Sequence, residues 1–179
     1  MEPPEMINAG ELVLKRWETE WAAAATEAIK ESLPELRQFL PWATDAYGPA
    51  ESHEYIARSR AEWDAGTQYN YAVFTTVGEL AGSIGLMTRL GPGTLEIGYW
   101  TRTRFAGRGY MTAAVGAISR VGLALPGIER MVIKHDERNG ASGAVAVKAG
   151  FREVARETGD PESDGESGTT IVRELRPRD

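Results

Sequence analysis

The sequence predicts an α/β (α+β) fold, in which helices pack against a mixed β-sheet. Two observations support this class. Segments with the alternation or β-rich composition of strands recur along the chain, and stretches of good helix formers separate them. Their order is helices early, a strand meander in the middle, and then a β-α-β-α-β-β run. That order is typical of a sheet covered by helices.

The first half of the chain supplies one strand and the early helices. ELVLKRW (11–17) alternates apolar and charged residues, as a half-buried strand does. A helix is expected to begin at Thr19, a candidate N-cap, and to stop at Pro34. PELRQFLPW then predicts a short helix or turn, and AESHEYIARSRAEWDAG predicts a helix that its final glycine closes.

The middle and the second half of the chain supply the sheet. QYNYAVFTT and LAGSIGLMTRL predict two antiparallel strands with a tight turn, and TLEIGYWT predicts a third. The helix YMTAAVGAISRVGLAL, the strand ERMVIKH, the small-residue helix NGASGAVAVKAG and the strand FREVARE follow. With no repeat and no long linker, residues 1–179 are expected to form a single domain. Its core covers about 10–157, an acidic loop about 157–168, and a closing strand about 169–175.

Composition excludes several classes of site. The chain has no cysteine, so disulfides, thiolate metal sites and cysteine nucleophiles are absent. His53 and His135 are the two histidines and lie far apart in sequence, so no metal site is expected. The net charge is −6, and five acidic groups come from ETGDPESDGE (157–166), so a nucleic-acid surface is not expected. We expect no membrane span and no signal peptide, and a cytoplasmic location.

A glycine-flanked turn precedes one predicted helix. The first amide N–H groups of a helix have no partner within it, and the helix dipole adds partial positive charge there. Gly107 and Gly109 on either side of Arg108 therefore predict an anion cradle, with a plain strand-to-helix turn as the alternative. The turn has neither the Gly-Lys-Ser/Thr ending of a P-loop nor the third glycine of a dinucleotide fingerprint.

Two longer segments carry a family resemblance. LEIGYWTRTRFAGRGYMTAAV, followed by NGASGAVAVKAGF, resembles the acyl-CoA-binding core of the GNAT superfamily of N-acetyltransferases, especially the RimJ/RimL group of protein N-terminal acetyltransferases. LRQFLPW and the helix after it are also similar to that group, so the likeness covers residues 10–157. The resemblance implies a mostly antiparallel mixed sheet of about seven strands with helices on both faces.

The resemblance also implies the donor and its binding residues. The donor is acetyl-CoA, with no metal. The family loop pattern fits here in two registers, residues 104–109 or residues 106–111, and the second agrees better with the way the loop enters the helix. The nearer phosphate partner, Arg104 or Arg108, stays open. The implied CoA-binding residues are Trp100, Thr101, Arg102, Arg104, Ala106, Gly107, Arg108, Gly109, Tyr110, Met111, Thr112, Asn139 and Ser142.

Direct acetyl transfer to an amine needs a base, a polarised thioester and a proton donor for the departing thiolate. By resemblance, Ser142 is the proton donor, and Asn139 contacts the pantetheine arm or caps its helix. Glu96 is the first candidate for the base and for contact with the acceptor, with a solvent-facing glutamate as the alternative. Glu157 and Glu162 are weaker candidates for the base.

Substrate recognition is assigned to Trp42, which lies where the group builds its substrate pocket, although a buried core tryptophan is the alternative. The acidic stretch 157–166 is expected to be a mobile loop, or else to attract a cationic acceptor. The predicted activity is acetyl transfer to a protein or peptide N-terminal amine. A small amine as acceptor and a CoA-binding module without activity are the alternatives. Members of the group often form dimers, so the resemblance also allows a homodimer.

Overall fold

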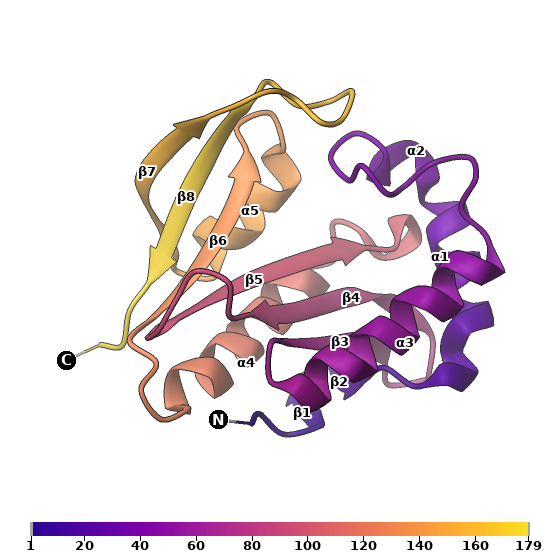
Figure 1. Cartoon of the computed structure of the whole chain (residues 1–179), viewed down its shortest axis with the longest axis horizontal. Coiled ribbons are helices and arrows are strands. Elements are labelled where there is room, and N and C mark those ends of the chain that lie inside the picture. The colour runs from indigo at the N-terminus through magenta and orange to yellow at the C-terminus, as the bar shows by residue number, and fades with distance from the viewer. Residues whose placement is uncertain (1, 179) are drawn as a thin grey trace.

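The computed structural model describes residues 2–178, in which eight strands form a single sheet of order β1-β2-β3-β4-β5-β6-β8-β7 (Figure 1). All pairs are antiparallel except β5 with β6. The strands are β1 (Met6–Ala9), β2 (Leu12–Arg16), β3 (Gln68–Thr75), β4 (Leu80–Met87), β5 (Thr94–Thr101), β6 (Arg130–Asp136), β7 (Arg152–Thr158) and β8 (Thr169–Leu175).

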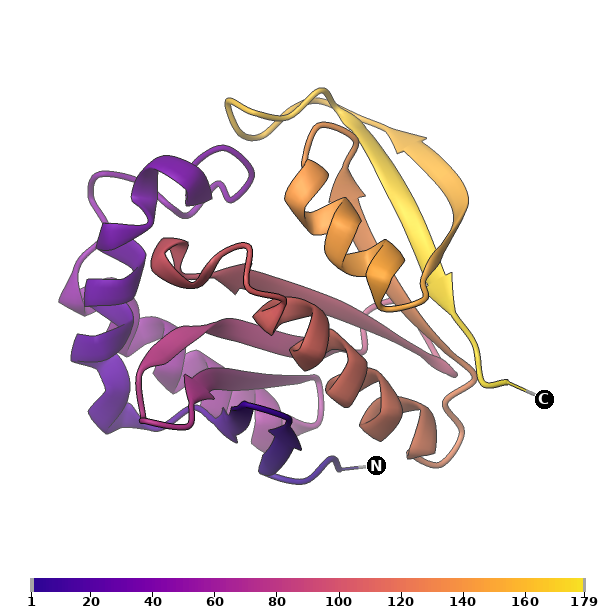
Figure 2. The same cartoon turned by 180° about the vertical axis from the view of Figure 1, so that it is seen from behind.

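Helices cover both faces of this sheet (Figures 1 and 2). One face carries α4 and α5 over a core that includes Leu95, Ile97 and Val115, and the other carries α1 and α3 over Trp17, Ile29 and Trp100. The helices are α1 (Ala22–Glu31), α2 (Leu33–Leu36), α3 (Pro49–Ala65), α4 (Tyr110–Ala124) and α5 (Gly140–Lys148), with 3₁₀ turns η1 (Thr19–Trp21) and η2 (Thr103–Phe105). The predicted fold class, mixed and mostly antiparallel, is confirmed.

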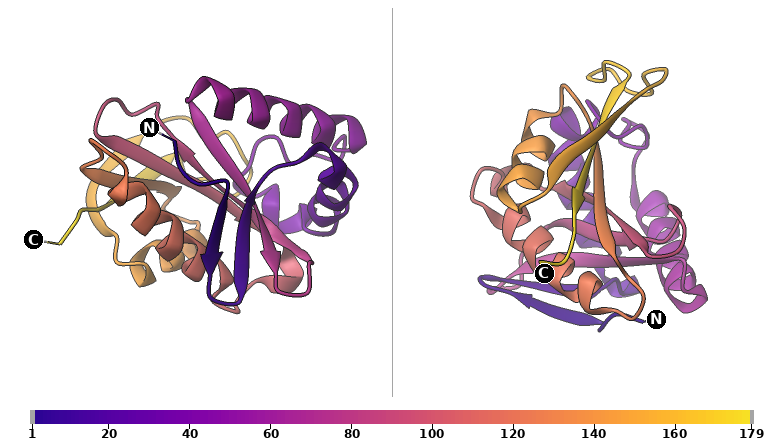
Figure 3. Two further views of the ribbon diagram at one scale, coloured as in Figure 1. Left: turned by 90° about the horizontal axis from the view of Figure 1, so that it is seen from below. Right: turned by 90° about the vertical axis from the view of Figure 1, so that its left-hand side faces the viewer.

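Three local predictions need correction. The expected seven strands become eight, because Met6–Ala9 pairs with β2 as a short edge strand that its four residues did not reveal (Figure 3). Thr19 opens η1 and not α1, and no side chain caps either turn. The helix ends at Glu31 and not at Pro34. Proline occupies the first turn of α2, where its missing N–H costs no hydrogen bond.

The sheet opens in the middle, between β5 and β6. Their parallel pairing extends from Thr94 opposite Arg130 to Ile97 opposite Ile133 and no further. The second half of β5 keeps its pairing with β4, and the second half of β6 keeps its pairing with β8. The two strands therefore diverge, as Figure 1 shows.

Candidate active site

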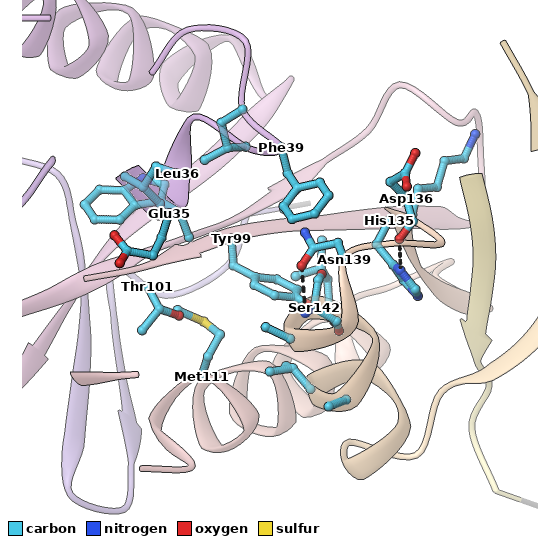
Figure 4. A pocket seen from close by; sticks show the side chains of 18 of the residues that line it. Glu35, Leu36, Phe39, Tyr99, Thr101, Met111, His135, Asp136, Asn139 and Ser142 are labelled. Atoms are coloured by element: carbon cyan, nitrogen blue, oxygen red, sulfur yellow. Dashed lines mark hydrogen bonds between the residues drawn. The ribbon is translucent and has the colours of Figure 1, made fainter. Parts of the chain in front are cut away.

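The divergence of β5 and β6 opens into a cleft of about 910 Å³ (Figure 4). Its walls are the free half of β5, the turn into α4, the first turns of α5, the end of β6, and α2 with the residues after it. The loop between β7 and β8 lies across the opening. The Gly165 amide in that loop donates to the Gln38 carbonyl at 2.8 Å, so the two walls meet. The predicted mobile loop is thus anchored to the segment after α2.

The turn around Gly107 and Gly109, predicted to be an anion cradle, has the backbone conformation that its glycines indicated. Gly107 and Gly109 have φ of +74° and +76°, the left-handed region that favours glycine. No atom lies within 4 Å of the place where a side chain would begin at either residue. Gly109 is the N-cap of α4 and no side chain caps the helix. The first backbone bond of the helix runs from Ala113 to Gly109 at 3.0 Å.

The amides before that bond are available for an anion. Within residues 2–178, no backbone hydrogen bond outside regular helix and strand pairing takes up the amides of 107–112. The first helical amides lack a helical partner by construction. The turn residues that line the cleft are Ala106, Gly107, Gly109, Tyr110, Met111 and Thr112. Open space, unpaired amides and a helix N-terminus are the features that binding of a diphosphate requires.

The arginines near the turn differ in availability. Arg102 is 6% exposed and its guanidinium bonds to Glu31, to Glu27 at 3.5 Å and to the Leu80 carbonyl at 3.3 Å. It does not line the cleft. Its assignment to the CoA site is therefore corrected: Arg102 joins β5 to α1.

Arg104 and Arg108 are the two residues left as candidates for the nearer phosphate partner. Arg104 is also held by Glu31, with Nε 2.9 Å from a carboxylate oxygen. Arg108 lies over the Phe105 ring at 5.5 Å and has no carboxylate partner in the described part of the chain. Neither guanidinium lines the cleft in this arrangement. Of the two, Arg108 is the one that can turn to a phosphate without breaking an ion pair.

The free edge of β5 offers main-chain groups to a ligand. The Arg102 amide donates to the Ala81 carbonyl at 2.8 Å, so the sheet already uses it. Because neighbouring residues of an antiparallel strand direct their N–H and C=O groups to opposite edges, Trp100 shares that edge. Tyr99 and Thr101 then direct their groups to the open edge. Of the CoA-binding residues predicted at 100–102, Thr101 is thus the one whose main-chain groups face the open edge, together with those of Tyr99.

Ser142 and Asn139 lie together on the first turn of α5. The Asn139 side chain accepts from the Ser142 amide at 3.2 Å, so the predicted N-cap role is present, and both residues line the cleft. The Ser142 hydroxyl donates to the Tyr99 hydroxyl at 2.9 Å. That hydroxyl donates in turn to the Ser142 carbonyl at 2.9 Å. Figure 4 shows Tyr99 pointing from β5 towards α5.

Tyr99 is a site residue that the sequence analysis missed. Burial raises the pKa of Tyr99 to about 12, while the Ser142 hydroxyl acts in the opposite direction. The phenol therefore stays protonated at neutral pH and can both accept from Ser142 and donate to a carbonyl. Its place on the strand face opposite Glu96 was visible in the sequence, but nothing there indicated contact with α5.

Glu96 is not free to act as predicted. Its side chain is 2% exposed, and Arg89 binds both of its oxygens, with Nε at 2.9 Å from one and Nη2 at 3.0 Å from the other. Arg89 lines the cleft and Glu96 does not. The structure therefore does not bring Glu96 together with Ser142. Because Arg89 bonds to both oxygens, the Glu96 carboxylate would have to leave this ion pair to meet an amine.

The two weaker base candidates do line the cleft. Glu157 is paired with Lys134, at 2.8 Å. Glu162 has an exposed carboxylate with no hydrogen-bond or ion-pair partner in the described chain, although its amide donates to Glu166. Asp160 and Glu166 line the same side of the cleft. The acidic loop thus edges the site and does not extend away from it.

His135 is buried, which the sequence analysis did not expect. Its Nδ1 lies 2.8 Å from the Asp136 carbonyl and its Nε2 accepts from Arg173 at 2.9 Å. Burial lowers the pKa of His135, so the neutral ring is favoured. Both ring nitrogens are engaged, which leaves neither for proton transfer. The alternation of His135 with Met131 and Ile133 in β6 was the available signal for burial.

Trp42 lies outside the cleft but borders a second hollow on the other face of β5. It is 43% exposed, so the core alternative does not apply. Its ring meets Trp100 edge-on at 6.4 Å. Among residues 2–178, no group of three or more acidic, histidine or cysteine side chains is placed to hold a metal, and no helix is long and apolar enough to cross a membrane.

Comparison of structures places this fold among known acetyltransferases. RimL, the ribosomal L7/L12 α-N-protein acetyltransferase, was solved with coenzyme A and superposes with a TM-score of 0.87 at 22% identity, over 96% of this chain and 98% of its own. The microcin C7 self-immunity acetyltransferase MccE, solved with acetyl-CoA and AMP, superposes with a TM-score of 0.86 at 20% identity, over 94% of this chain and 93% of its own. RimJ of Mycobacterium smegmatis superposes with a TM-score of 0.84 at 21% identity, over 98% of this chain and 90% of its own.

Comparison of sequences identifies the family. No curated protein sequence matches this chain. The family model of the acetyltransferase (GNAT) domain, however, matches residues 11–152, which is most of the chain. That span includes the divergent strands, the glycine turn and α5. The chain therefore belongs to the GNAT family of acetyltransferases, enzymes that take the acetyl group from acetyl-CoA.

Proposed function

We propose that the protein acetylates the α-amine of a protein or peptide N-terminus. The observation that carries this proposal is the acidic loop across the cleft, where Glu157, Asp160, Glu162 and Glu166 face an opening large enough for an extended chain end. A terminal amine arrives as a cation, and carboxylates attract it. The similar structure of RimL, an α-N-protein acetyltransferase, supports the same acceptor class.

The donor would lie with its diphosphate in the cradle of 107–112 and its pantetheine arm along the free edge of β5. Acetyl-CoA supplies an activated acyl group, so no covalent enzyme intermediate is needed. The Thr101 or Tyr99 amide, on the open edge of β5, would donate to the acyl oxygen. Asn139 and Thr112 border the same space, and Arg108 would turn to the phosphates.

The protons would move through side chains on both walls. Ser142 lines the cleft, and its hydroxyl would turn its proton from the Tyr99 oxygen to the departing thiolate, so we keep Ser142 as the proton donor and assign Tyr99 as its positioning residue. For the base we propose Glu162, since it is the predicted carboxylate that no cation occupies. It would take the amine proton directly or through water.

Thiol release against a panel of acceptors tests the acceptor class. We expect turnover with short peptides bearing a free α-amine, and none when that amine is blocked. Preference for polyamines or aminoglycosides over every peptide would contradict the proposal. In the same assay, Glu162→Gln should lower kcat by about 100-fold, the lower end for general base catalysis. Asp164→Asn makes the same charge change in the same loop outside the cleft, and should not.

Ser142 and Tyr99 should act as one unit. We expect Ser142→Ala to lower kcat about 100-fold, because the proton donor is lost while Tyr99 still bonds the backbone carbonyl. Tyr99→Phe should lower kcat less, by about 10-fold, because only the orientation of the serine suffers. Because the two hydroxyls form one hydrogen-bonded pair, the double variant should be no slower than Ser142→Ala.

Steady-state kinetics of the three variants, with acetyl-CoA binding measured by thermal shift, check this prediction. The thermal shift should stay at the wild-type value, because neither hydroxyl belongs to the phosphate cradle. Losses that multiply in the double variant would mean that the two hydroxyls act separately. A wild-type kcat in Ser142→Ala would leave the serine with only its place beside the Asn139 cap.

A further inference from the structure

A second hollow, of about 390 Å³, lies on the face of the sheet that carries α1 and α3, opposite α4 and α5. We call it the aromatic hollow, because Trp42, Tyr47, Tyr55 and Trp100 line it. The cradle and α5 contribute nothing to it. It is therefore distinct from the place assigned to the donor.

Two glycines lie at the floor of the hollow. Gly85 of β4 and Gly98 of β5 stand directly opposite each other in the strand register, and both belong to the lining. A Cβ at Gly98 would lie 3.1 Å from the Met87 methyl, and one at Gly85 would lie 2.1 Å from the Asn70 side-chain oxygen. Asn70 therefore packs directly on Gly85, and a larger residue at Gly98 would press on Met87, which also lines the hollow.

The polar groups of the floor are already satisfied within the protein. Asn70 accepts from Gln68 and donates to Ser59, both at 3.0 Å. The Ser83 hydroxyl accepts from the Trp17 indole at 3.1 Å and donates to the Tyr71 carbonyl at 3.2 Å.

No side chain lining the hollow, in the described part of the chain, has a buried polar atom without a partner. The floor thus offers aromatic and aliphatic surface, and a polar guest would lose its hydration without replacement.

Charge is confined to the rim of the hollow. Glu54 and Arg58 of α3 line it with side chains that are 76% and 55% exposed, and their ion pair is long, at 3.7 Å. Glu51 is exposed and accepts from the Gly48 amide. A solvated rim above an apolar floor is the usual build of a pocket for an apolar group.

The hollow is continuous with the reaction cleft. Leu40, Gly98, Tyr99 and Trp100 line both spaces. In a peptide, the terminal amine and the side chain of the first residue are bonded to the same carbon. A first residue whose amine lies at the cleft must therefore place its side chain next to that shared wall.

We propose that the aromatic hollow binds the side chain of the acceptor's first residue and selects a large apolar or aromatic one. This inference rests on the proposed function. Trp42 is the specificity-determining residue, because it is the exposed aromatic of the set and its ring meets both Trp100, at 6.4 Å, and Tyr47, at 5.8 Å. Burial of an apolar side chain against these rings contributes a free energy of binding that a first residue without a side chain, glycine, cannot provide.

Peptides that differ only in their first residue test the inference. With glycine, lysine, leucine and phenylalanine at that position, kcat/KM should rise from glycine to leucine and phenylalanine by about 10-fold or more. Trp42→Ala should bring the phenylalanine-to-glycine ratio close to one. The ratio is used because a general loss of activity cancels from it. Val77→Ala is the matched control: Val77 is 80% exposed in the β3–β4 turn, and its removal should leave the ratio unchanged.

Gly98→Ala is the second variant, in case Trp42→Ala is poorly folded. It fills the floor against the movable end of Met87 and should also lower the ratio. Equal rates with all four peptides, or a preference for lysine or glycine, would overturn the inference and leave the proposed function standing. Failure to acetylate any peptide, with acetyl-CoA still raising the melting temperature, would instead overturn the proposed function, and the inference with it.

Discussion

Gly107→Val is expected to abolish binding of acetyl-CoA. Gly107 has φ of +74° and faces open space where the diphosphate would approach the backbone. A β-branched side chain there both occupies the approach and drives the turn out of the left-handed region, so that the amides of 107–112 no longer converge. The loss should exceed about 100-fold in Kd, since several charge-assisted hydrogen bonds are lost together.

A thermal-shift titration measures this effect. Ligand at 100 times Kd should stabilise the wild type by about 2.7 kcal/mol, which corresponds to roughly 5 to 10 °C for a domain of this size. Gly107→Val should show no shift at the same concentration.

Gly127→Val is the matched control, because Gly127 has φ of +79°, has no atom within 4 Å of its Cβ position, and lies outside the cleft. It should lose the same stability to strain and keep the ligand shift. A full shift in Gly107→Val would mean that the diphosphate binds elsewhere.

Glu31→Gln is expected to destabilise the fold by about 3 kcal/mol, because it leaves the buried Arg102 guanidinium without its main counter-charge. The Arg102 side chain is 7% exposed and that of Glu31 is 29% exposed. The remaining partner, Glu27, lies 3.5 Å away and is 73% exposed. Since Arg102 ties the end of β5 to α1, the wall of the cleft that continues into α2 should loosen with it.

The same pair predicts a dependence of stability on pH. The hydrogen bond from Arg102 lowers the pKa of Glu31 in the folded protein, so the folded state binds this proton less readily than the unfolded chain does. The contribution of Glu31 is therefore fully present above the unfolded pKa, about 4.3, and is lost as pH falls through the lower folded pKa. Glu31→Gln should therefore reduce the loss of folding stability that accompanies a fall in pH over this range.

Urea unfolding from pH 7 to pH 3 checks both statements about Glu31. Glu153→Gln is the control, because it removes an ion pair with Arg156 on exposed β7. Exposed pairs contribute at most about 1 kcal/mol. A loss in Glu31→Gln no greater than in the control would mean that Arg102 finds other partners, and the joint between α1 and β5 would then depend on packing alone.

Local structure could be predicted from the sequence wherever a short stretch determines its own conformation. The turn around Gly107 requires glycine for positive φ whatever surrounds it, and the Asn139 cap involves a residue three positions away. The Gly66 C-cap of α3 is left-handed as expected. Period-two alternation separates Ile97, which belongs to the core under α4, from Trp100, which belongs to the core on the other face.

Contacts between side chains could not be predicted from the sequence, and they decide which groups are free. Glu96 is paired with Arg89, which is close in sequence but lies in the β4–β5 turn, whereas Tyr99 reaches α5, 43 positions along the chain. Arg102 and Arg104 both meet Glu31, more than 70 positions away. A motif specifies which residue types are present, but the partner of a charged side chain depends on how the elements pack, and the partner decides whether the group is free to react.

The sequence by itself determined the fold class, the conformation of the glycine turn and the family, because these rest on backbone preferences and on spacing within single segments. Only the tertiary structure decided which carboxylate is unoccupied, which arginine is available and where the aromatic hollow lies. Those properties depend on how the strands and helices pack, which brings together residues that the chain itself keeps far apart.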